Sequence, residues 1–226
     1  QFADFLDELS RRVGFFNPDT AWPERFSRLA RSAAGKSIGR AEDIRLIHCV
    51  SRPVLDQLAE AALSEGGSKS LRVLSPFYDS DAAAVAELAK RSGSKNVTIG
   101  LLLDHAEASP FPFAKRFVDF KVAAASVQVP DEQRRLHAKW IECELANGKR
   151  LLTTGSVNAT WQSLCTTKNI EVNILRVEGI GQDSRLSWKK TAAPKIQSIP
   201  KRIEPGLGSR AILYASLAEG GRIHGT

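Results

Sequence analysis

Residues 137–158 read HAKWIECELANGKRLLTTGSVN, and residues 169–174 read NIEVNI. The pair Asn147-Gly148 lies between two runs that are rich in apolar residues, and this arrangement is a strong signal for a β-hairpin. Residues 169–174 alternate between polar and apolar side chains, which is typical of a half-buried strand. Together the two stretches predict three neighbouring strands of one sheet.

The polar side chains of these strands are expected to gather on one surface. Side chains alternate between the two faces of a strand, so His137 and Lys139 are expected on the same side of the first strand. Ser156 and Asn158 are expected to share a face of the second strand, and Glu171 belongs to the polar set of the third. We therefore expect His137, Lys139, Asn158 and Glu171 to meet on one polar surface.

These side chains are of the types that phosphodiester chemistry needs. The neutral imidazole of His137 can attack phosphorus, and such nucleophilic catalysis splits one difficult step into two. A carboxylate bonded to the other ring nitrogen fixes the tautomer and stabilises the imidazolium, and Glu171 is the candidate for this role. Lys139 supplies a compact cation for a phosphate oxygen. Asn158 and Ser156 add hydrogen-bond donors to the same oxygens, where charge develops in the transition state.

The order H-x-K, then G-S-x-N, then N-x-E extends over about 35 residues and resembles the phospholipase D superfamily, whose repeat is often called the HKD motif. The resemblance implies that His137 is the covalent nucleophile or its acid/base partner. It also implies that Lys139 and Asn158 bind phosphate and that Glu171 supports the histidine. A non-catalytic, scaffolding repeat is the alternative, because fold does not guarantee function.

The chain departs from this family at one motif position. The third letter of the motif is an aspartate, and the matching position here holds Glu144. Strand alternation from His137 puts Glu144 on the opposite face, so we interpret it as a structural residue. The stretch Val73-Leu-Ser-Pro-Phe-Tyr-Asp79 also resembles the opening of a phospholipase D-like repeat, and the resemblance thus covers residues 43–178.

Predicted helices and strands alternate along the chain, which favours an α/β fold: a phospholipase D-like repeat with a mixed β-sheet flanked by helices. Beyond the motif strands, we expect strands at 43–50, 71–75, 96–103 and 126–129, and helices at 2–14, 22–29, 53–63 and 79–91.

Three regions follow from this reading. Residues 1–42 are expected to be a helical linker segment, and residues 43–178 a phospholipase D-like domain with a single HKD motif. Residues 179–226 are expected to be a basic extended linker, with a strand at 211–217 that begins a further C-terminal element. Because the sequence contains no methionine, we expect a fragment of a longer protein. Residues 1–42 resemble the linker between two repeats, which implies that the fragment is the C-terminal half of a two-repeat chain.

The composition favours a protein that meets a polyanion. The net charge is +7 and the isoelectric point is about 9.5, which suits nucleic acid as a partner. No apolar run approaches the ~20 residues that span a bilayer, and no signal segment opens the chain. An ordinary solvated surface is the alternative for each of the basic groups, which are Arg134-Arg135, Lys149-Arg150, and Arg185, Lys189, Lys190, Lys195, Lys201 and Arg202.

The cysteines and histidines indicate neither a disulfide scaffold nor a metal site. Cys49, Cys143 and Cys165 are odd in number and irregular in spacing, which is typical of a reducing cytosol, so we expect a cytoplasmic protein with buried thiols. They show no C-x-x-C spacing, and the four histidines are scattered. We therefore expect a reaction without a metal or other cofactor.

The resemblance also implies that half of the site comes from elsewhere. Members of the family use two histidines, one of which attacks while the other protonates the leaving oxygen. His48, His105 and His224 are each followed by sequence without a lysine two residues on. The second half is thus expected from a homodimer, which would be an isologous arrangement, or from a missing upstream repeat.

Three functions compete at this point. The first is metal-independent hydrolysis of phosphodiesters through a phosphohistidine, by one half-site of a DNA or RNA nuclease. The second is a phospholipase or phosphatidyl transferase, with Phe111-Pro-Phe113 as a small membrane anchor. The third is a non-catalytic nucleic-acid-binding module. The choice between DNA, RNA and lipid, any base specificity, the architecture of the parent protein and its pathway remain open, since phosphate contacts carry no base information.

Overall fold

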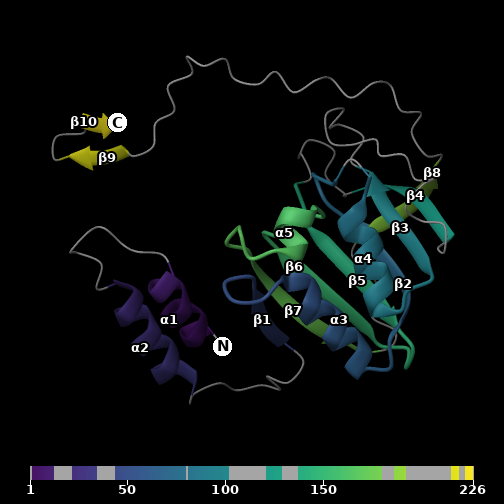
Figure 1. The fold of residues 1–226 in the computed structure, drawn as a ribbon, viewed down its shortest axis with the longest axis horizontal. Coiled ribbons are helices and arrows are strands. Elements are labelled where there is room, and N and C mark those ends of the chain that lie inside the picture. The colour runs from purple at the N-terminus through teal and green to yellow at the C-terminus, as the bar shows by residue number, and fades with distance from the viewer. Residues whose placement is uncertain are drawn as a thin grey trace.

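The fold is an α/β arrangement built on one eight-stranded mixed sheet, seen in a computed structural model (Figure 1). The structure describes residues 2–12, 22–34, 44–79, 81–101, 121–128, 137–179, 186–191, 215–218 and 222–225. The strand order is β1-β7-β6-β5-β2-β3-β4-β8, in which β2 runs parallel to β3 and β3 to β4, while the other neighbours are antiparallel. The expected fold class is therefore confirmed.

Seven of the eight strands overlap strands that the sequence predicts, although their ends differ, and the eighth, β8, was not expected. Their bounds are β1 Ile44–His48, β2 Ser68–Leu74, β3 Asn96–Leu101, β4 Lys121–Gln128, β5 Trp140–Leu145, β6 Arg150–Gly155, β7 Val172–Glu178 and β8 Ser187–Thr191. β4 is longer than the expected strand at 126–129. The extra part contains three successive alanines, and alanine is depleted in strands, so the sequence pattern hides it.

Three helices cover one face of the sheet: α3 (Val54–Ser64), α4 (Ala83–Ser92) and α5 (Trp161–Cys165) (Figure 1). Their apolar side chains form the main core with the inward residues of the strands, such as Ile141, Cys143 and Leu145 of β5. The even-numbered residues of β5 face the other side of the sheet, because side chains alternate along a strand. Glu142 and Glu144 lie on that second face.

The predicted hairpin is confirmed. β5 and β6 pair antiparallel, and the Leu145 amide donates to the Lys149 carbonyl at 2.9 Å to close the turn. Gly148 has a φ of 84°, a left-handed conformation that glycine adopts without the steric cost of a side chain. The first strand begins only at Trp140, however, so His137 and Lys139 precede it and the expected alternation does not govern them.

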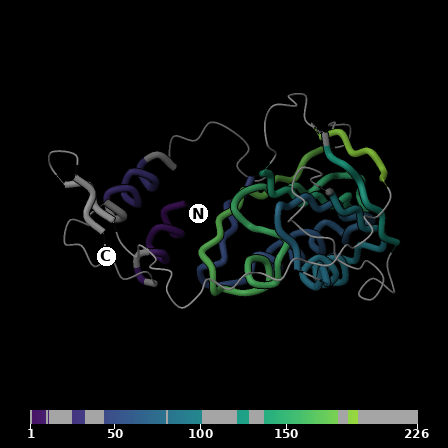
Figure 2. Tube along the Cα trace, turned by 90° about the horizontal axis from the view of Figure 1, so that it is seen from above, coloured from purple at the N-terminus to yellow at the C-terminus, as the bar shows by residue number. Residues whose placement is uncertain are grey.

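Residues 1–42 form more than a connection. Helix α1 (Phe2–Arg12) packs against α2 (Trp22–Ala34). Phe5 of α1 also contacts the His48 ring at the end of β1, and both views place α1 beside this edge of the sheet (Figure 1, Figure 2). Phe5 and Leu6 of α1 form a small second core with Val50, against which Leu46 and Val172 pack. The helices expected at 2–14 and 22–29 are thus present, and the second is longer.

The sheet continues past the domain boundary expected at residue 178. β8 pairs antiparallel with β4 and forms an edge of the sheet, although 179–226 reads as a linker. Trp188 of β8 packs against β3, since a Cβ built at Gly100 would lie only 3.0 Å from the indole ring. β9 (Ala215–Ala218) pairs with β10 (Arg222–Gly225) in a separate two-stranded sheet, and β9 overlaps the strand expected at 211–217.

Several residues singled out from the sequence lie outside the described ranges. They are His105, the candidate anchor Phe111-Pro-Phe113, and the basic residues Arg134, Arg135, Arg185, Lys195, Lys201 and Arg202. Among the helices that the structure describes, none has both the length and the apolar character needed to cross a bilayer.

Candidate functional site

The motif residues lie at one end of four neighbouring strands. β2 and β6 end where β5 and β7 begin. Leu74 of β2 pairs with Trp140 of β5, and Gly155 of β6 pairs with Asn173 of β7. Each of these four strand ends carries a polar residue one position beyond it. These residues are Ser75 after β2, Lys139 before β5, Ser156 after β6 and Glu171 before β7. The antiparallel order of the strands therefore brings together residues that are up to 96 positions apart.

His137 is exposed in this cluster, and Lys139 beside it is partly buried. The Lys139 Nζ lies 2.9 Å from the His137 Nδ1. An ammonium group has donors and no acceptor, so this contact is a hydrogen bond to Nδ1 in the tautomer of His137 that carries its proton on Nε2. Partial burial lowers the pKa of Lys139, and the nearby charge of Glu171 opposes part of that effect.

Glu171 is buried, with 6% of its surface exposed, and its carboxylate accepts two hydrogen bonds. Ser156 Oγ donates to one oxygen at 2.5 Å, and Asn169 Nδ2 donates to the other at 3.3 Å. Of the bonds described for this carboxylate, none goes to His137, the partner that the family resemblance implies. Glu171 instead lies close enough to Lys139 for its negative charge to raise the pKa of the lysine.

In the third motif strand, the polar side chains are buried and the apolar ones are exposed, which is the reverse of an ordinary half-buried strand. Glu171 and Asn173 are buried, with 6% and 2% of their surface exposed, whereas Ile170 and Ile174 are 53% and 47% exposed. Hydrogen bonds explain why the polar side chains can lie inside. Asn173 Oδ1 accepts from the Val157 amide at 3.1 Å, and the Asn173 amide nitrogen donates to Thr153 Oγ1 at 3.3 Å.

The G-S-x-N segment is a loop that follows β6, so Ser156 and Asn158 do not share a strand face as expected. Gly155 is required where the loop begins, because a Cβ there would lie 2.3 Å from the Val172 carbonyl oxygen. The Ser75 hydroxyl holds the other end of the loop. It accepts from the Ala159 amide at 3.0 Å and lies 3.5 Å from Asn158 Oδ1.

A second loop, residues 75–79, lies beside the first. Tyr78 and Ala159 form a parallel β-bridge, and the Asp79 carboxylate accepts from the backbone amides of Trp161 and Ala84 at 2.8 and 3.0 Å. Asp79 therefore joins the start of α5 to the start of α4. Ser75, Asp79 and Asn173 were not identified as site residues from the sequence. The alternation of Asn173 with Glu171 and the motif-like stretch 73–79 were the available signals.

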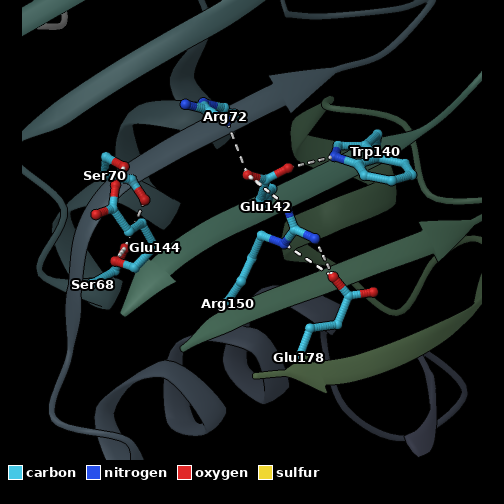
Figure 3. A network of polar contacts seen from close by, with 8 residues as sticks. All are labelled: Ser68, Ser70, Arg72, Trp140, Glu142, Glu144, Arg150 and Glu178. Carbon is cyan, nitrogen blue, oxygen red and sulfur yellow. Dashed lines mark hydrogen bonds and ion pairs between the residues drawn. The ribbon is translucent and has the colours of Figure 1, made fainter. Parts of the chain in front are cut away.

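A polar network supports β5 from the other face of the sheet (Figure 3). Glu142 is 4% exposed and accepts from Arg72 at 3.1 Å and from the Trp140 indole at 3.2 Å, while Arg150 joins Glu142 to Glu178. Trp140 directly follows Lys139, so this network holds the start of the strand on which the motif depends.

The motif residue Glu144 also lies on this second face. It is exposed and accepts from Ser70 Oγ at 3.0 Å (Figure 3). The basic pair of the hairpin is engaged in ion pairs as well. Lys149 binds Glu65 at 3.1 Å, and Arg150 binds Glu178. Lys149 and Arg150 are therefore better described as ordinary ion-paired residues than as free cations that contact phosphate.

The three thiols are free. Cys49 and Cys143 are buried as expected, whereas Cys165 is partly exposed. Burial raises the pKa of Cys143 and of Cys165 to about 12. In the ranges that the structure covers, no three His, Cys, Asp or Glu side chains gather so that they could hold a metal ion.

No protein-family model and no curated protein matches this chain. Solved structures match parts of it at low sequence identity. Yeast tyrosyl-DNA phosphodiesterase is 16% identical with a TM-score of 0.40, over 62% of this chain and 34% of that one. Nuc from Salmonella typhimurium, a phospholipase D family member, is 16% identical with a TM-score of 0.38, over 61% of this chain and 83% of that one.

A further match is NucT from Helicobacter pylori, which is 12% identical with a TM-score of 0.34, over 60% of this chain and 86% of that one. The chain spans about a third of the length of the yeast enzyme. Each of these three matches covers about three-fifths of this chain.

Proposed function

We propose that this chain carries one half of a phosphodiesterase site that acts on nucleic acid through a phosphohistidine. One observation carries the proposal: His137 and Lys139 lie 2.9 Å apart at the strand ends where Asn158 and the buried Glu171 also lie. An imidazole, a cation and an amide in one place suit nucleophilic attack on phosphorus and charge stabilisation of its oxygens. The net charge of +7 supports a polyanionic substrate.

Binding of the substrate starts the proposed reaction. A non-bridging phosphate oxygen takes over the hydrogen bond from Lys139, and the lone pair of His137 Nδ1 becomes available. Asn158 donates to a second phosphate oxygen. The negative charge of Glu171 raises the pKa of Lys139 and so opposes the larger effect of burial, which lowers it.

Two displacements then complete the hydrolysis. In the first, the nitrogen–phosphorus bond forms, the bond to the leaving oxygen breaks, and that oxygen receives a proton from a second acid. In the next, water attacks the phosphohistidine, its proton returns to the second group, and the bond to His137 breaks. We propose that the second group is the histidine of a paired half, supplied by a second copy of this chain or by another repeat.

A chromogenic phosphodiester tests this proposal. Bis(p-nitrophenyl) phosphate should release p-nitrophenol with an initial burst if the phosphohistidine accumulates. Each assay is paired with light scattering, so that the activity of monomer and dimer can be compared. Excess EDTA should leave the rate unchanged.

The variants separate catalysis from binding. His137→Ala should abolish turnover, and Lys139→Ala should weaken binding of the diester. Lys90→Ala, which changes an exposed lysine on α4, serves as the control. Full turnover by His137→Ala would overturn the proposal. Binding that is lost in Lys139→Ala, without turnover in any dimer, would favour a non-catalytic nucleic-acid-binding module.

A further inference from the structure

Three large apolar side chains that lie close in sequence to site residues are exposed. Phe77 is 52% exposed, Trp161 is 48% exposed and Ile170 is 53% exposed. Phe77 is the one that contacts the catalytic candidate. Its ring lies edge-to-face against the His137 imidazole, with 6.2 Å between the ring centroids and an interplanar angle of 77°.

The backbone around Phe77 is rigidly held. Ser75 Oγ donates to the Phe77 carbonyl at 2.8 Å and accepts from the Phe77 amide at 3.3 Å. The next side chain, Tyr78, packs against the main core, and its hydroxyl lies 2.9 Å from the Gly100 carbonyl and 3.0 Å from that of Val73. The ring of Phe77 is thus presented on a loop that is already ordered.

The hydrogen bonds described for this loop do not involve the Phe77 ring. The contacts that hold the loop come from backbone groups and from the side chains of Ser75, Tyr78 and Asp79. Burying a phenylalanine would stabilise the protein, yet about half of this one faces solvent. An exposed, pre-positioned aromatic ring beside a phosphate site is the arrangement on which nucleic-acid-binding proteins stack bases.

We propose that Phe77 is the stacking platform for the nucleobase next to the scissile phosphate, and that the site therefore takes single-stranded nucleic acid. This inference rests on the function proposed above, because the phosphate held at His137 and Lys139 places the attached nucleotide beside the ring. In a duplex, neighbouring bases cover the faces of each base, so the platform selects an unpaired base.

Matched oligonucleotides separate stacking from phosphate binding. Fluorescence anisotropy measures the Kd of labelled hexathymidylate, of an abasic hexamer with the same phosphates, and of a fully paired DNA hairpin, with each oligonucleotide verified as intact by gel. The wild type should bind hexathymidylate about 5- to 150-fold more tightly than the abasic strand, the range that stacking of one base provides. It should also prefer the single strand to the paired hairpin.

Phe77→Leu should remove this preference and leave the Kd of the abasic strand unchanged. Phe2→Leu is the control, because Phe2 is 49% exposed on α1, at the β1 end of the sheet. Equal affinity of the wild type for both strands, or equal losses on both strands in Phe77→Leu, would overturn the inference. A Phe77→Leu change that alters only the monomer–dimer equilibrium would show that a second copy covers the ring, and would also overturn it.

The same oligonucleotides distinguish a failure of the proposed phosphate site from a failure of the stacking platform. Lys139→Ala should weaken binding of the abasic strand, because that strand retains the phosphates. If Lys139→Ala binds the abasic strand as the wild type does, the phosphate site is wrong, whatever Phe77→Leu does. If Lys139→Ala loses binding while the base preference is absent, the phosphate site stands and the stacking platform is wrong.

Discussion

Ser156 directs its hydroxyl proton to the carboxylate of Glu171, with 2.5 Å between the two oxygens. The same hydroxyl also accepts from the Val172 amide at 3.0 Å. Its single proton is already used in the bond to Glu171. We interpret Ser156 as the residue that orients Glu171 beside Lys139. Direct donation to phosphate, expected from the sequence, would require Ser156 to leave the carboxylate.

The first prediction concerns the contribution of the Ser156–Glu171 hydrogen bond to stability. Ser156→Ala leaves one oxygen of a buried carboxylate without its donor, so the free energy of unfolding should fall by about 1–3 kcal/mol. Urea denaturation measures the change. Ser64→Ala is the control, since that hydroxyl bonds a backbone carbonyl at the end of α3. An unchanged midpoint for Ser156→Ala would mean that the bond contributes nothing to stability.

Gly155 should tolerate no side chain. A Cβ at this position would lie 2.3 Å from the Val172 carbonyl oxygen, and overpacking of this kind costs about 1–3 kcal/mol or more. Gly155→Ala should therefore lower the urea midpoint, and it should also disturb diester binding through the adjacent loop. Gly179→Ala provides the matched control, because no described atom lies within 4 Å of its Cβ. Similar effects of the two changes would contradict the packing argument.

The charge of Lys139 should limit anion binding at high pH. Burial lowers the pKa of Lys139 below the ordinary value of 10.5. Because only the protonated amine attracts phosphate, diester affinity should fall with rising pH sooner than an ordinary lysine would allow. Lys139→Arg should extend binding to higher pH, and Glu171→Gln should move the loss to lower pH. A Kd that is constant up to pH 10.5 would refute this assignment.

His48 should make stability depend on pH. Burial lowers the pKa of His48 below 6.5, and Glu8 opposes part of this effect. Its ring contacts Phe5 of α1, and among the described atoms Nδ1 has no hydrogen-bond partner. The unfolded chain thus binds more protons near this residue, so the free energy of unfolding should fall as pH drops below about 6.5.

Denaturation as a function of pH tests the role of His48. His48→Phe retains a ring against Phe5 and removes the titrating group. The variant should lose much of the dependence between pH 6.5 and 5, and its stability should be close to that of the wild type at pH 8. An unchanged slope would assign the dependence to other groups.

The two glutamates of β5 should differ in their importance. Glu142 is 4% exposed, but its partners Arg72 and Arg150 are 41% and 15% exposed, so solvent screens the pairs and their loss should cost less than the ~3–5 kcal/mol of a fully buried pair. Glu142→Gln should therefore lower the free energy of unfolding by about 1–3 kcal/mol. Glu144→Gln changes an exposed residue of the same strand and should have an effect below about 1 kcal/mol. A larger effect for Glu144 would assign the supporting role to the motif position instead.

The sequence by itself determined the elements whose signals are local. Alternation and the Asn147-Gly148 turn predicted the β5–β6 hairpin, because backbone conformation at a two-residue turn depends on the residues in the turn. Periodicity likewise located α3 and α4. The same local patterns predicted that His137, Lys139, Asn158 and Glu171 belong to one region, and the strand ends bring them there.

Only the tertiary structure decided which partners these residues have. Ser75 and Asp79 reach the cluster from a segment that is distant in sequence, and the antiparallel order of β2, β5, β6 and β7 brings them to the motif residues. β8 was hidden for the same reason, because pairing with β4 stabilises a short strand whose own pattern is weak. Hydrogen bonds across strands depend on register, and register is a property of the assembled sheet rather than of any one segment.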